Sequence, residues 1–470
     1  MHSIHLSAAA LAVAALSFPA AAQFNATQLS RFDPSGVSYN DVWGYVAPDG
    51  REFAILGATT GTYILDCSDP TSPRQTGFIS GRNSTWRDMR TFGQYVYVVT
   101  EGGGGVQVID MSDPDSPVLA NTFGQSSVGA AHNVALDTGT GLLYPCGSNS
   151  GVPIFDLNVD PLNPPQIGSY TSAYVHDLAV EHGYGHLGEI NNSRYRIIDV
   201  SNPASVQILG SASVSSCHNA WPSRDGQVAV ATSERSNGGL TVFDISDKRL
   251  VQQRAFMRTG GSGTSVHNAY FRDRVVHASY YSEGYYAMDV TDAGTPVKVA
   301  SFDTSSSTRG FSGAWGCYPF QPSGVVYISD TSNGLYVFGT PATTDLYGDG
   351  TAGAGTPTVH SFGAPYAGNA NFAFEIEDAT PGTAVSLFVC AAADDLTFSG
   401  LRVLVDLGGP FVMLSATADA NGKAVFSVPL AQTLNATTIF VQAVTADASG
   451  PMGLSATKGM QVDIFKLGNL

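Results

Sequence analysis

Short segments in which apolar and polar residues alternate recur along the first 340 residues, separated by clusters of Gly, Pro, Asp and Ser. In one such unit, QYVYVVT (94–100) and VQVID (106–110) flank four glycines, and SDPDSP (112–117) precedes a further apolar segment (118–123). β-Branched and aromatic residues between turn-forming clusters are typical of strands. The pattern predicts an all-β fold whose units each contain four short antiparallel strands.

The unit repeats with a nearly constant period. In four units the first strand opens on a His–Asx pair: His132-Asn133, His176-Asp177, His218-Asn219 and His267-Asn268. Three related positions carry Asn40-Asp41, Arg87-Asp88 and Gly313-Ala314, so that successive units begin 42 to 49 residues apart. A period in this range is typical of an array of one supersecondary unit. Seven four-stranded units predict a seven-bladed β-propeller, which we place at residues 23–341.

The two ends of the repeat array complement each other. The seventh unit stops after its third strand, 334–338, and residues 26–32 (ATQLSRF) resemble the missing fourth strand. We therefore expect the N-terminal strand to close the last blade, which would leave no unpaired edge.

Beyond the array, the composition changes. Residues 342–358 form a Gly/Thr-rich stretch that we interpret as a linker. Residues 359–470 contain seven short apolar segments separated by turns such as DANG (419–422). This pattern predicts a C-terminal β-sandwich, which could serve in anchoring or sorting.

The third strand of the unit ends on an aspartate in six copies: Asp66, Asp110, Asp156, Asp199, Asp244 and Asp289. A Ser-Asp-Pro or related turn often follows it. Because a short acidic side chain beside Pro can bond its own backbone, we expect these aspartates to set turns.

This strand and turn, TYILDCSDPTSP from Thr62 and VQVIDMSDPDSP from Val106, resemble the LVIVD-repeat proteins of bacterial cell surfaces. The openings Trp43-Gly44 and Trp86-Arg87-Asp88, and the FSGAW segment from Phe311, resemble the choice-of-anchor B family more narrowly. The resemblance covers about residues 36–340. It implies an exported propeller joined to a variable anchoring or sorting region, and it implies no established reaction.

The N-terminal segment predicts where the protein is located, and the protein's net charge argues against some classes of partner. An apolar run (7–18) followed by three alanines before Gln23 predicts a signal peptide at 1–22, and hence a secreted or cell-surface protein. No later segment is long enough to span a bilayer. Lys and Arg number 22 against 39 Asp and Glu, and a net charge of −17 argues against nucleic acid and anionic membranes as partners. Five dispersed cysteines predict buried thiols rather than a disulfide framework.

The candidate chemistry lies at the starts of the first strands. In a propeller the first strand is innermost, so the His–Asx pairs and the acidic residues near the ends of the second strands should surround one mouth of the channel. The candidate metal ligands are His132, His176, His218 and His267, with Asp88, Asp177, Glu189 and Glu283 in support. Four imidazoles would suit Zn²⁺, and mixed His and carboxylate ligands would suit Mn²⁺ or Ca²⁺. The alternative is that these side chains only join neighbouring blades by hydrogen bonds.

Two functions remain open from the sequence. The first is a monomeric binding module that takes a protein, glycan or small-molecule ligand on this face. The second is a metal-dependent hydrolase or lyase with Glu101 or Glu234 as the base.

Gly102–Gly105 is expected to be a hairpin turn, since no helix follows it, and no organic cofactor is expected. The four tryptophans, Trp43, Trp86, Trp221 and Trp315, are expected to pack in the core rather than to form a ligand platform.

Overall fold

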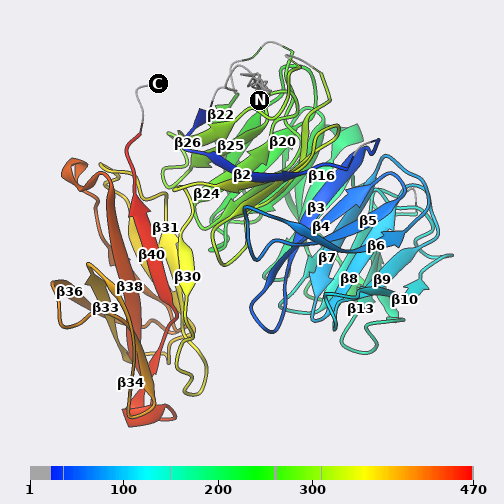
Figure 1. Ribbon diagram of the computed structural model, residues 1–470. Helices are drawn as coiled ribbons and strands as arrows, with labels where there is room; N and C mark the ends of the chain where they lie inside the picture. The colour runs from blue at the N-terminus through cyan, green and yellow to red at the C-terminus, as the bar shows by residue number, and fades with distance from the viewer. Residues whose placement is uncertain are drawn as a thin grey trace, which may run out of the picture.

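The computed structural model describes residues 23–34, 36–148, 150–258, 261, 263–307 and 310–467. Regular structure in these residues is almost entirely β-strand, and Figure 1 shows the strands gathered in two regions. The helical turns found there are short 3-10 turns: η1 (Ile190–Asn192), η2 (Pro203–Ser205), η3 (Gln432–Leu434) and η4 (Pro451–Gly453). The expected signal peptide lies outside the described residues. No helix in the described part of the chain is long and apolar enough to cross a membrane.

Within the described residues, seven antiparallel sheets follow one another along residues 23–339, and the four strands of each of the first six units pair in chain order. The first strands are β3 (Tyr39–Val46), β7 (Arg87–Phe92), β11 (Asn133–Asp137), β15 (Asp177–Glu181), β19 (Cys217–Pro222), β23 (Ala269–Arg272) and β27 (Ala314–Tyr318). The second strands are β4 (Glu52–Ala58), β8 (Tyr95–Thr100), β12 (Leu142–Cys146), β16 (Tyr184–Glu189), β20 (Val228–Ser233), β24 (Val275–Ser279) and β28 (Val326–Asp330).

The outer half of each sheet is made by the third and fourth strands of the unit. The third strands are β5 (Gly61–Asp66), β9 (Val106–Asp110), β13 (Val152–Asp156), β17 (Arg194–Asp199), β21 (Leu240–Asp244), β25 (Tyr285–Asp289) and β29 (Gly334–Gly339). The fourth strands of the first six sheets are β6 (Arg74–Ser80), β10 (Val118–Phe123), β14 (Gln166–Tyr170), β18 (Gln207–Ser213), β22 (Gln252–Met257) and β26 (Val297–Phe302).

The N-terminal segment supplies the fourth strand of the last sheet. β2 (Thr27–Phe32) pairs antiparallel with β29, with Gln28 opposite Phe338, so the pairing expected for residues 26–32 is present. A two-residue strand that the sequence did not indicate, β1 (Gln23–Phe24), adds to the sixth sheet by pairing with β26.

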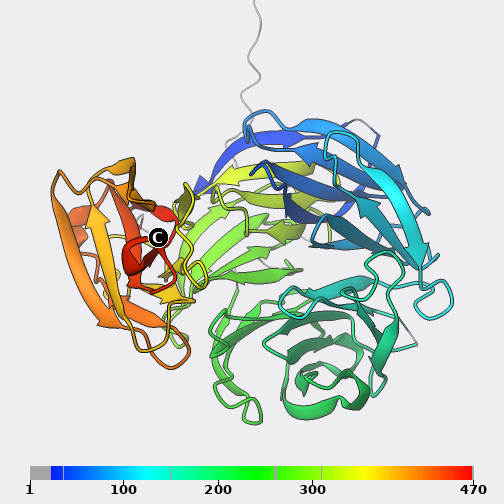
Figure 2. The same cartoon turned by 90° about the horizontal axis from the view of Figure 1, so that it is seen from below.

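The seven first strands lie side by side. Each contacts the first strand of the next sheet, and β27 contacts β3, so the contacts run from the last sheet back to the first. Figure 2 shows these sheets arranged around a common centre, which is the arrangement of a β-propeller. Buried apolar residues fill the space between neighbouring sheets; one such cluster joins Tyr97 and Val99 of β8 to Val134 of β11.

The aspartates that end the third strands do set turns, as expected. Each accepts a hydrogen bond from the backbone N–H two residues on; the Ser112 N to Asp110 Oδ1 distance, for example, is 2.8 Å. The same bond is made by Asp66, Asp156, Asp199, Asp244 and Asp289. The five cysteines are free and buried, also as expected.

The strands of the C-terminal region form three sheets in the described residues. The largest contains β30 (Asp345–Tyr347), β40 (Gly459–Ile464), β38 (Thr437–Ala446), β33 (Ala384–Cys390) and β36 (Phe411–Thr417), with β39 (Leu454–Ala456) paired to β38. The others are β31 (Thr358–Phe362), β32 (Ala373–Glu377) and β37 (Ala424–Ser427), and the pair β34 (Ala393–Phe398) and β35 (Leu401–Val405). β30 lies within the stretch that we interpreted as a linker.

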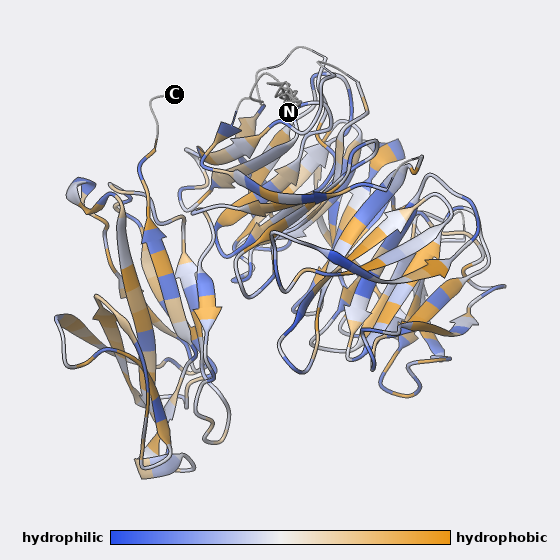
Figure 3. Cartoon of the chain, in the orientation of Figure 1, coloured by the Kyte–Doolittle hydropathy of each residue, from blue (hydrophilic) through white to orange (hydrophobic). Residues whose placement is uncertain are grey.

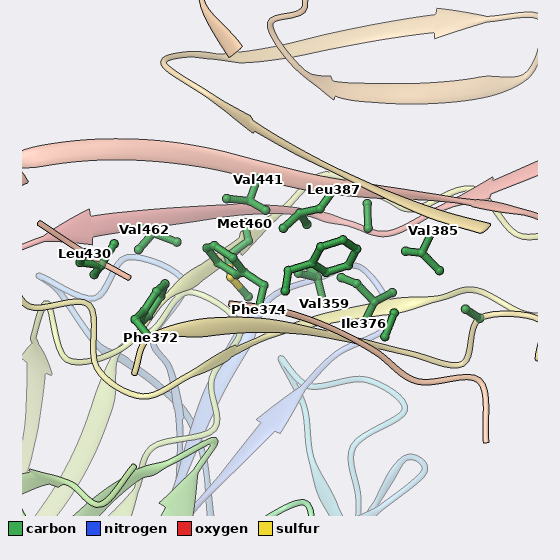
Figure 4. Packing of buried hydrophobic residues seen from close by; sticks show 14 of the residues in the cluster. Val359, Phe372, Phe374, Ile376, Val385, Leu387, Leu430, Val441, Met460 and Val462 are labelled. Atoms are coloured by element: carbon green, nitrogen blue, oxygen red, sulfur yellow. The ribbon is translucent and has the colours of Figure 1, made fainter. Parts of the chain in front are cut away.

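A hydrophobic core lies between the two larger of these sheets. Figure 4 shows Phe372 and Phe374 facing Leu387 and Val441 across it, and all four side chains are buried. Hydrophilic and hydrophobic residues alternate along β40 in Figure 3 because only one face of the strand meets this core.

Candidate functional site

The four candidate histidines are side by side. Each lies within two residues of the start of a first strand, and the adjacency of those strands places equivalent residues next to one another. The imidazole centroids of His132 and His176 are 4.2 Å apart, those of His176 and His218 are 4.3 Å apart, and those of His218 and His267 are 4.2 Å apart. The four rings therefore form one continuous row, which we call the histidine row.

Potential ligand atoms in the histidine row fall into two overlapping groups. One contains His132, His176 and His218, and the other contains His218, Glu234 and His267. Within each group the ligand atoms lie within 4.8 Å of one another. Because His218 belongs to both groups, an ion bound by one group would take a ligand from the other.

Hydrogen bonds fix the tautomer at the two ends of the row. The Nδ1–H of His132 donates to Glu101 Oε1 at 2.7 Å, and the Nδ1–H of His267 donates to the carbonyl oxygen of Trp315 at 2.8 Å. Carboxylate and carbonyl oxygens only accept, so Nδ1 must carry the proton and each Nε2 keeps its lone pair. This is the way in which metal-binding histidines are commonly oriented.

The middle of the row has nitrogens without partners. In the described residues, Nδ1 of His176 and both ring nitrogens of His218 are buried and make no hydrogen bond of good geometry; His218 has only a weak contact with the backbone of His267. Glu234 Oε2 is 3.8 Å from His218 Nε2, too far for a hydrogen bond, while the other oxygen of Glu234 accepts from the Tyr281 hydroxyl. Leaving a buried polar atom without a hydrogen bond costs about 1–3 kcal/mol of stability. A ligand that bound to these nitrogens would offset that cost.

The imidazoles of His176, His218 and His267 are held neutral. Burial, and then the neighbouring histidines, lower the pKa of His176 well below its ordinary value. Burial is also the main cause that lowers the pKa of His218 and of His267. A neutral imidazole is the form that binds a metal ion.

The acidic candidates divide between two environments. Glu101 and Glu234 reach the histidine row, as described above. Glu189 instead accepts hydrogen bonds from Arg196 and from Asn192, and Glu283 accepts one from the Tyr286 hydroxyl at 3.3 Å.

The Asx residues next to the histidines tie neighbouring sheets together. Asn219 donates to Asp177 at 2.8 Å, and Asp88 accepts from the backbone N–H of Val134 at 2.8 Å. Asp88 also forms a buried ion pair with Arg90 at 2.6 Å. Burial is the largest cause that raises the pKa of Asp177, to about 6. Asp88 and Asp177 therefore belong to a polar layer below the histidine row.

A cavity of about 700 Å³ lies at the opposite ends of the first strands, where the sequence indicated no site. Its lining includes Trp43, Trp221 and Phe320 together with Asp137 and Glu181. Both tryptophans pack against the cores between the sheets, as expected, but they are only partly buried and also line this cavity. One signal could have indicated this: Trp43 and Trp221 each stand two residues after the Asx of their unit.

The comparisons with known proteins identify the repeats. Residues 87–124 and 173–213, in the second and fourth units, match the LVIVD repeat. Together with the seven sheets, these matches define the chain as a β-propeller with LVIVD repeats. No curated protein matches the sequence.

Among solved structures, the chain is similar to the β-propeller domain of Cps50 (Swd1) from Myceliophteria thermophila. That match has 11% sequence identity and a TM-score of 0.49, and it covers 67% of this chain and 99% of that one. The chain is also similar to hydrazine synthase from Kuenenia stuttgartiensis, with 11% identity, a TM-score of 0.48, and coverage of 66% of this chain and 97% of that one.

Proposed function

We propose that the protein is a divalent-metal-binding propeller and that its metal is held by the histidine row. The observation that carries the proposal is a row of four adjacent imidazoles, two of which have buried nitrogens without hydrogen-bond partners. His132, His176 and His218 would supply three nitrogen ligands, with Glu101 orienting His132 from behind. An imidazole-rich set favours Zn²⁺ or another transition ion over Ca²⁺, which prefers oxygen ligands.

The wider role that fits this site is a binding module on the outside of the cell. The support is the segment 1–22, which reads as a signal peptide, and the residues that resemble the choice-of-anchor B family. In this proposal the propeller has seven blades, because seven sheets contact one another in a closed order and β2 completes the last of them. The C-terminal sheets, which pack around a common core, would be a β-sandwich used for anchoring or sorting.

A second candidate is a metal-dependent hydrolase or lyase. It is favoured by one observation: the carboxylate of Glu101, the candidate base, is solvent-exposed and lies 2.7 Å from His132. A metal ion in the row would lower the pKa of a bound water, and in this alternative Glu101 would accept its proton instead of orienting His132 from behind.

The metal proposal is tested by elemental analysis and by zinc titration of metal-free protein. The wild type should bind about one Zn²⁺ per chain, and the double variant His176→Ala/His218→Ala should lose at least about nine-tenths of that binding, since it removes the centre of the row. His182→Ala is the matched control, because His182 is exposed and its ring bonds to the Arg224 carbonyl, away from the row.

Folding of both variants is checked by circular dichroism. A wild type that takes up no Zn²⁺, Mn²⁺ or Ca²⁺, or a folded double variant that binds zinc as the wild type does, would leave the histidine row with only a packing role.

A further inference from the structure

The cavity at the far mouth of the channel is separate from the histidine row. β11 begins beside His132 and ends at Asp137, and β15 begins beside His176 and ends at Glu181. Asp137 and Glu181 line the cavity, so the two sites lie at opposite ends of the same strands. A volume of about 700 Å³ is within the range of small-molecule sites, roughly 300–1,000 Å³.

The repeat itself explains why one side of the channel is open. The residue two places after the Asx is Trp43 in β3, Trp221 in β19 and Tyr270 in β23. In the third and fourth sheets the same position holds Ala135 and Ala179. These are two adjacent sheets with small side chains at this position, whereas Gly316 of β27 stands alone between the sheets of Tyr270 and Trp43. The cavity wall beside the two alanines is made by residues 136–140 and 180–183.

The opposite wall is aromatic. The rings of Trp43 and Trp221 lie 6.4 Å apart, and Phe320 lies 6.0 Å from Trp43 and 6.1 Å from Trp221. Tyr318 packs edge-on against Trp43 at 4.9 Å and supports it from the side. Because Trp43, Trp221 and Phe320 are each only partly buried, part of this rigid aromatic surface faces the cavity.

The charged groups of the lining do not favour an anion. Arg90 is paired with Asp88, and Arg224 is paired with Glu375 and Glu377 from the C-terminal region. By contrast, no hydrogen bond or ion pair in the described residues involves the Glu181 side chain. An anionic ligand would meet two cations that are already neutralised and an unpaired carboxyl.

A cationic ligand is disfavoured for a different reason. Burial, and then the nearby Asp137, raise the pKa of Glu181 to about 8. At neutral pH most of Glu181 therefore carries a proton and has little charge with which to attract a cation. One face of the Trp43 indole is already covered by the Arg90 guanidinium, whose carbon lies 3.9 Å from the ring centroid, so that face is not open to a second cation.

We propose that this cavity binds a neutral saccharide. The C–H face of a sugar ring can pack on Trp43, Trp221 and Phe320, as apolar surfaces do on aromatic rings. Its hydroxyl groups can exchange hydrogen bonds with Glu181, Asp137 and the threonines of the rim, Thr138 and Thr140. Aromatic walls with a few convergent polar groups are the usual composition of such a site.

The test is isothermal titration calorimetry of the full chain with uncharged trisaccharides of glucose, mannose, galactose and xylose, supported by tryptophan fluorescence. At least one should bind, and Trp221→Ala and Glu181→Ala should each weaken its binding about tenfold or more, which corresponds to about 1.4 kcal/mol. Glu181→Ala should keep the fold because the Glu181 side chain makes no hydrogen bond or ion pair in the described residues, so this variant serves if Trp221→Ala is unstable.

Two control variants separate this site from the histidine row. Trp86→Ala removes a tryptophan whose ring lies 6.0 Å from that of His132, and it should bind the saccharide as the wild type does. The variant His176→Ala/His218→Ala should also bind it unchanged, so the metal proposal can fail without affecting this one. The saccharide assignment is overturned if no uncharged trisaccharide binds, if trigalacturonate or choline binds instead, or if folded Glu181→Ala retains full affinity.

Discussion

At the scale of single residues, the position of a glutamate at the end of the second strand decides its partner: in the strand pairing Glu189 corresponds to Thr100, one place before Glu101. Glu234 likewise stands one place after Ser233, which corresponds to Glu189. Three places before the aspartate that ends the third strand stand Gln107, Arg196 and Thr241 in the second, fourth and fifth units. Arg196 is charged and binds Glu189. Gln107 and Thr241 carry no charge, and in those units Glu101 and Glu234 reach the histidine row instead. The one-residue difference in position and the ion pair with Arg196 together separate Glu189 from the carboxylates that reach the channel mouth.

The carboxyl group of Glu181 should make stability depend on pH. Its pKa is raised to about 8 in the folded protein from its ordinary value of 4.5, so between these pH values the folded state holds more protons than the unfolded state. Raising the pH through this window therefore lowers the free energy of unfolding, by at most about 1.4 kcal/mol per pH unit from this group. Glu181→Gln should remove that contribution, so the variant should gain stability over the wild type between pH 5 and pH 8.

Urea denaturation of both proteins at several pH values in this window measures the difference. A stability difference that stays constant across the window would show that Glu181 titrates normally.

At the scale of elements, the sequence predicts what depends on local pattern. Strand alternation, the Asp-ended third strands and the constant period are all local, and they are enough to predict the propeller and to place four histidines at equivalent positions. The two-residue strand β1 is too short to leave a pattern. The cavity depends on side chains from units far apart in sequence, such as Trp43 and Trp221, and on the small residues Ala135 and Ala179 opposite them. Such packing is visible only once the strands are placed in space.

The turn that follows a third strand should depend on a side-chain oxygen rather than on charge. Asp110 Oδ1 accepts from Ser112 N at 2.8 Å and from the Gln94 side chain at 3.2 Å. Asp110→Ala should therefore lower the free energy of unfolding by about 1–2 kcal/mol. Asp110→Asn should lose less than half of this, because an amide oxygen can accept the same bonds. Urea denaturation measures both, and equal losses in the two variants would mean that the turn does not need an acceptor.

At the scale of the whole molecule, the propeller and the C-terminal region are joined by polar contacts at defined points. Arg224, in the turn after β19, pairs with Glu375 and Glu377 of β32 and lies 3.4 Å from Asp273. Asp289, which ends β25, accepts a hydrogen bond from Ala364 N at 2.7 Å. The Arg274 guanidinium lies over the Phe362 ring of β31 at 4.7 Å. Arg224 also lines the saccharide cavity, so the C-terminal region helps to fix one of its walls.

Removing Arg224 should uncouple the two regions. The side chain of Glu375 is 5% exposed, so Arg224→Ala leaves a buried carboxylate with Lys423 as its remaining ion-pair partner in the described residues. Removing one partner of a buried ion pair costs about 3–5 kcal/mol of stability. Part of that cost weakens the contact between the propeller and the C-terminal region. Calorimetry should show one unfolding transition in the wild type and two in Arg224→Ala.

Arg402→Ala is the control: Arg402 pairs with the exposed Asp349 and Asp395, and losing such pairs changes stability by about 0–1 kcal/mol. If Arg224→Ala unfolds in one transition at the wild-type midpoint, other contacts, such as those of Asp289 and Arg274, are sufficient to hold the two regions together.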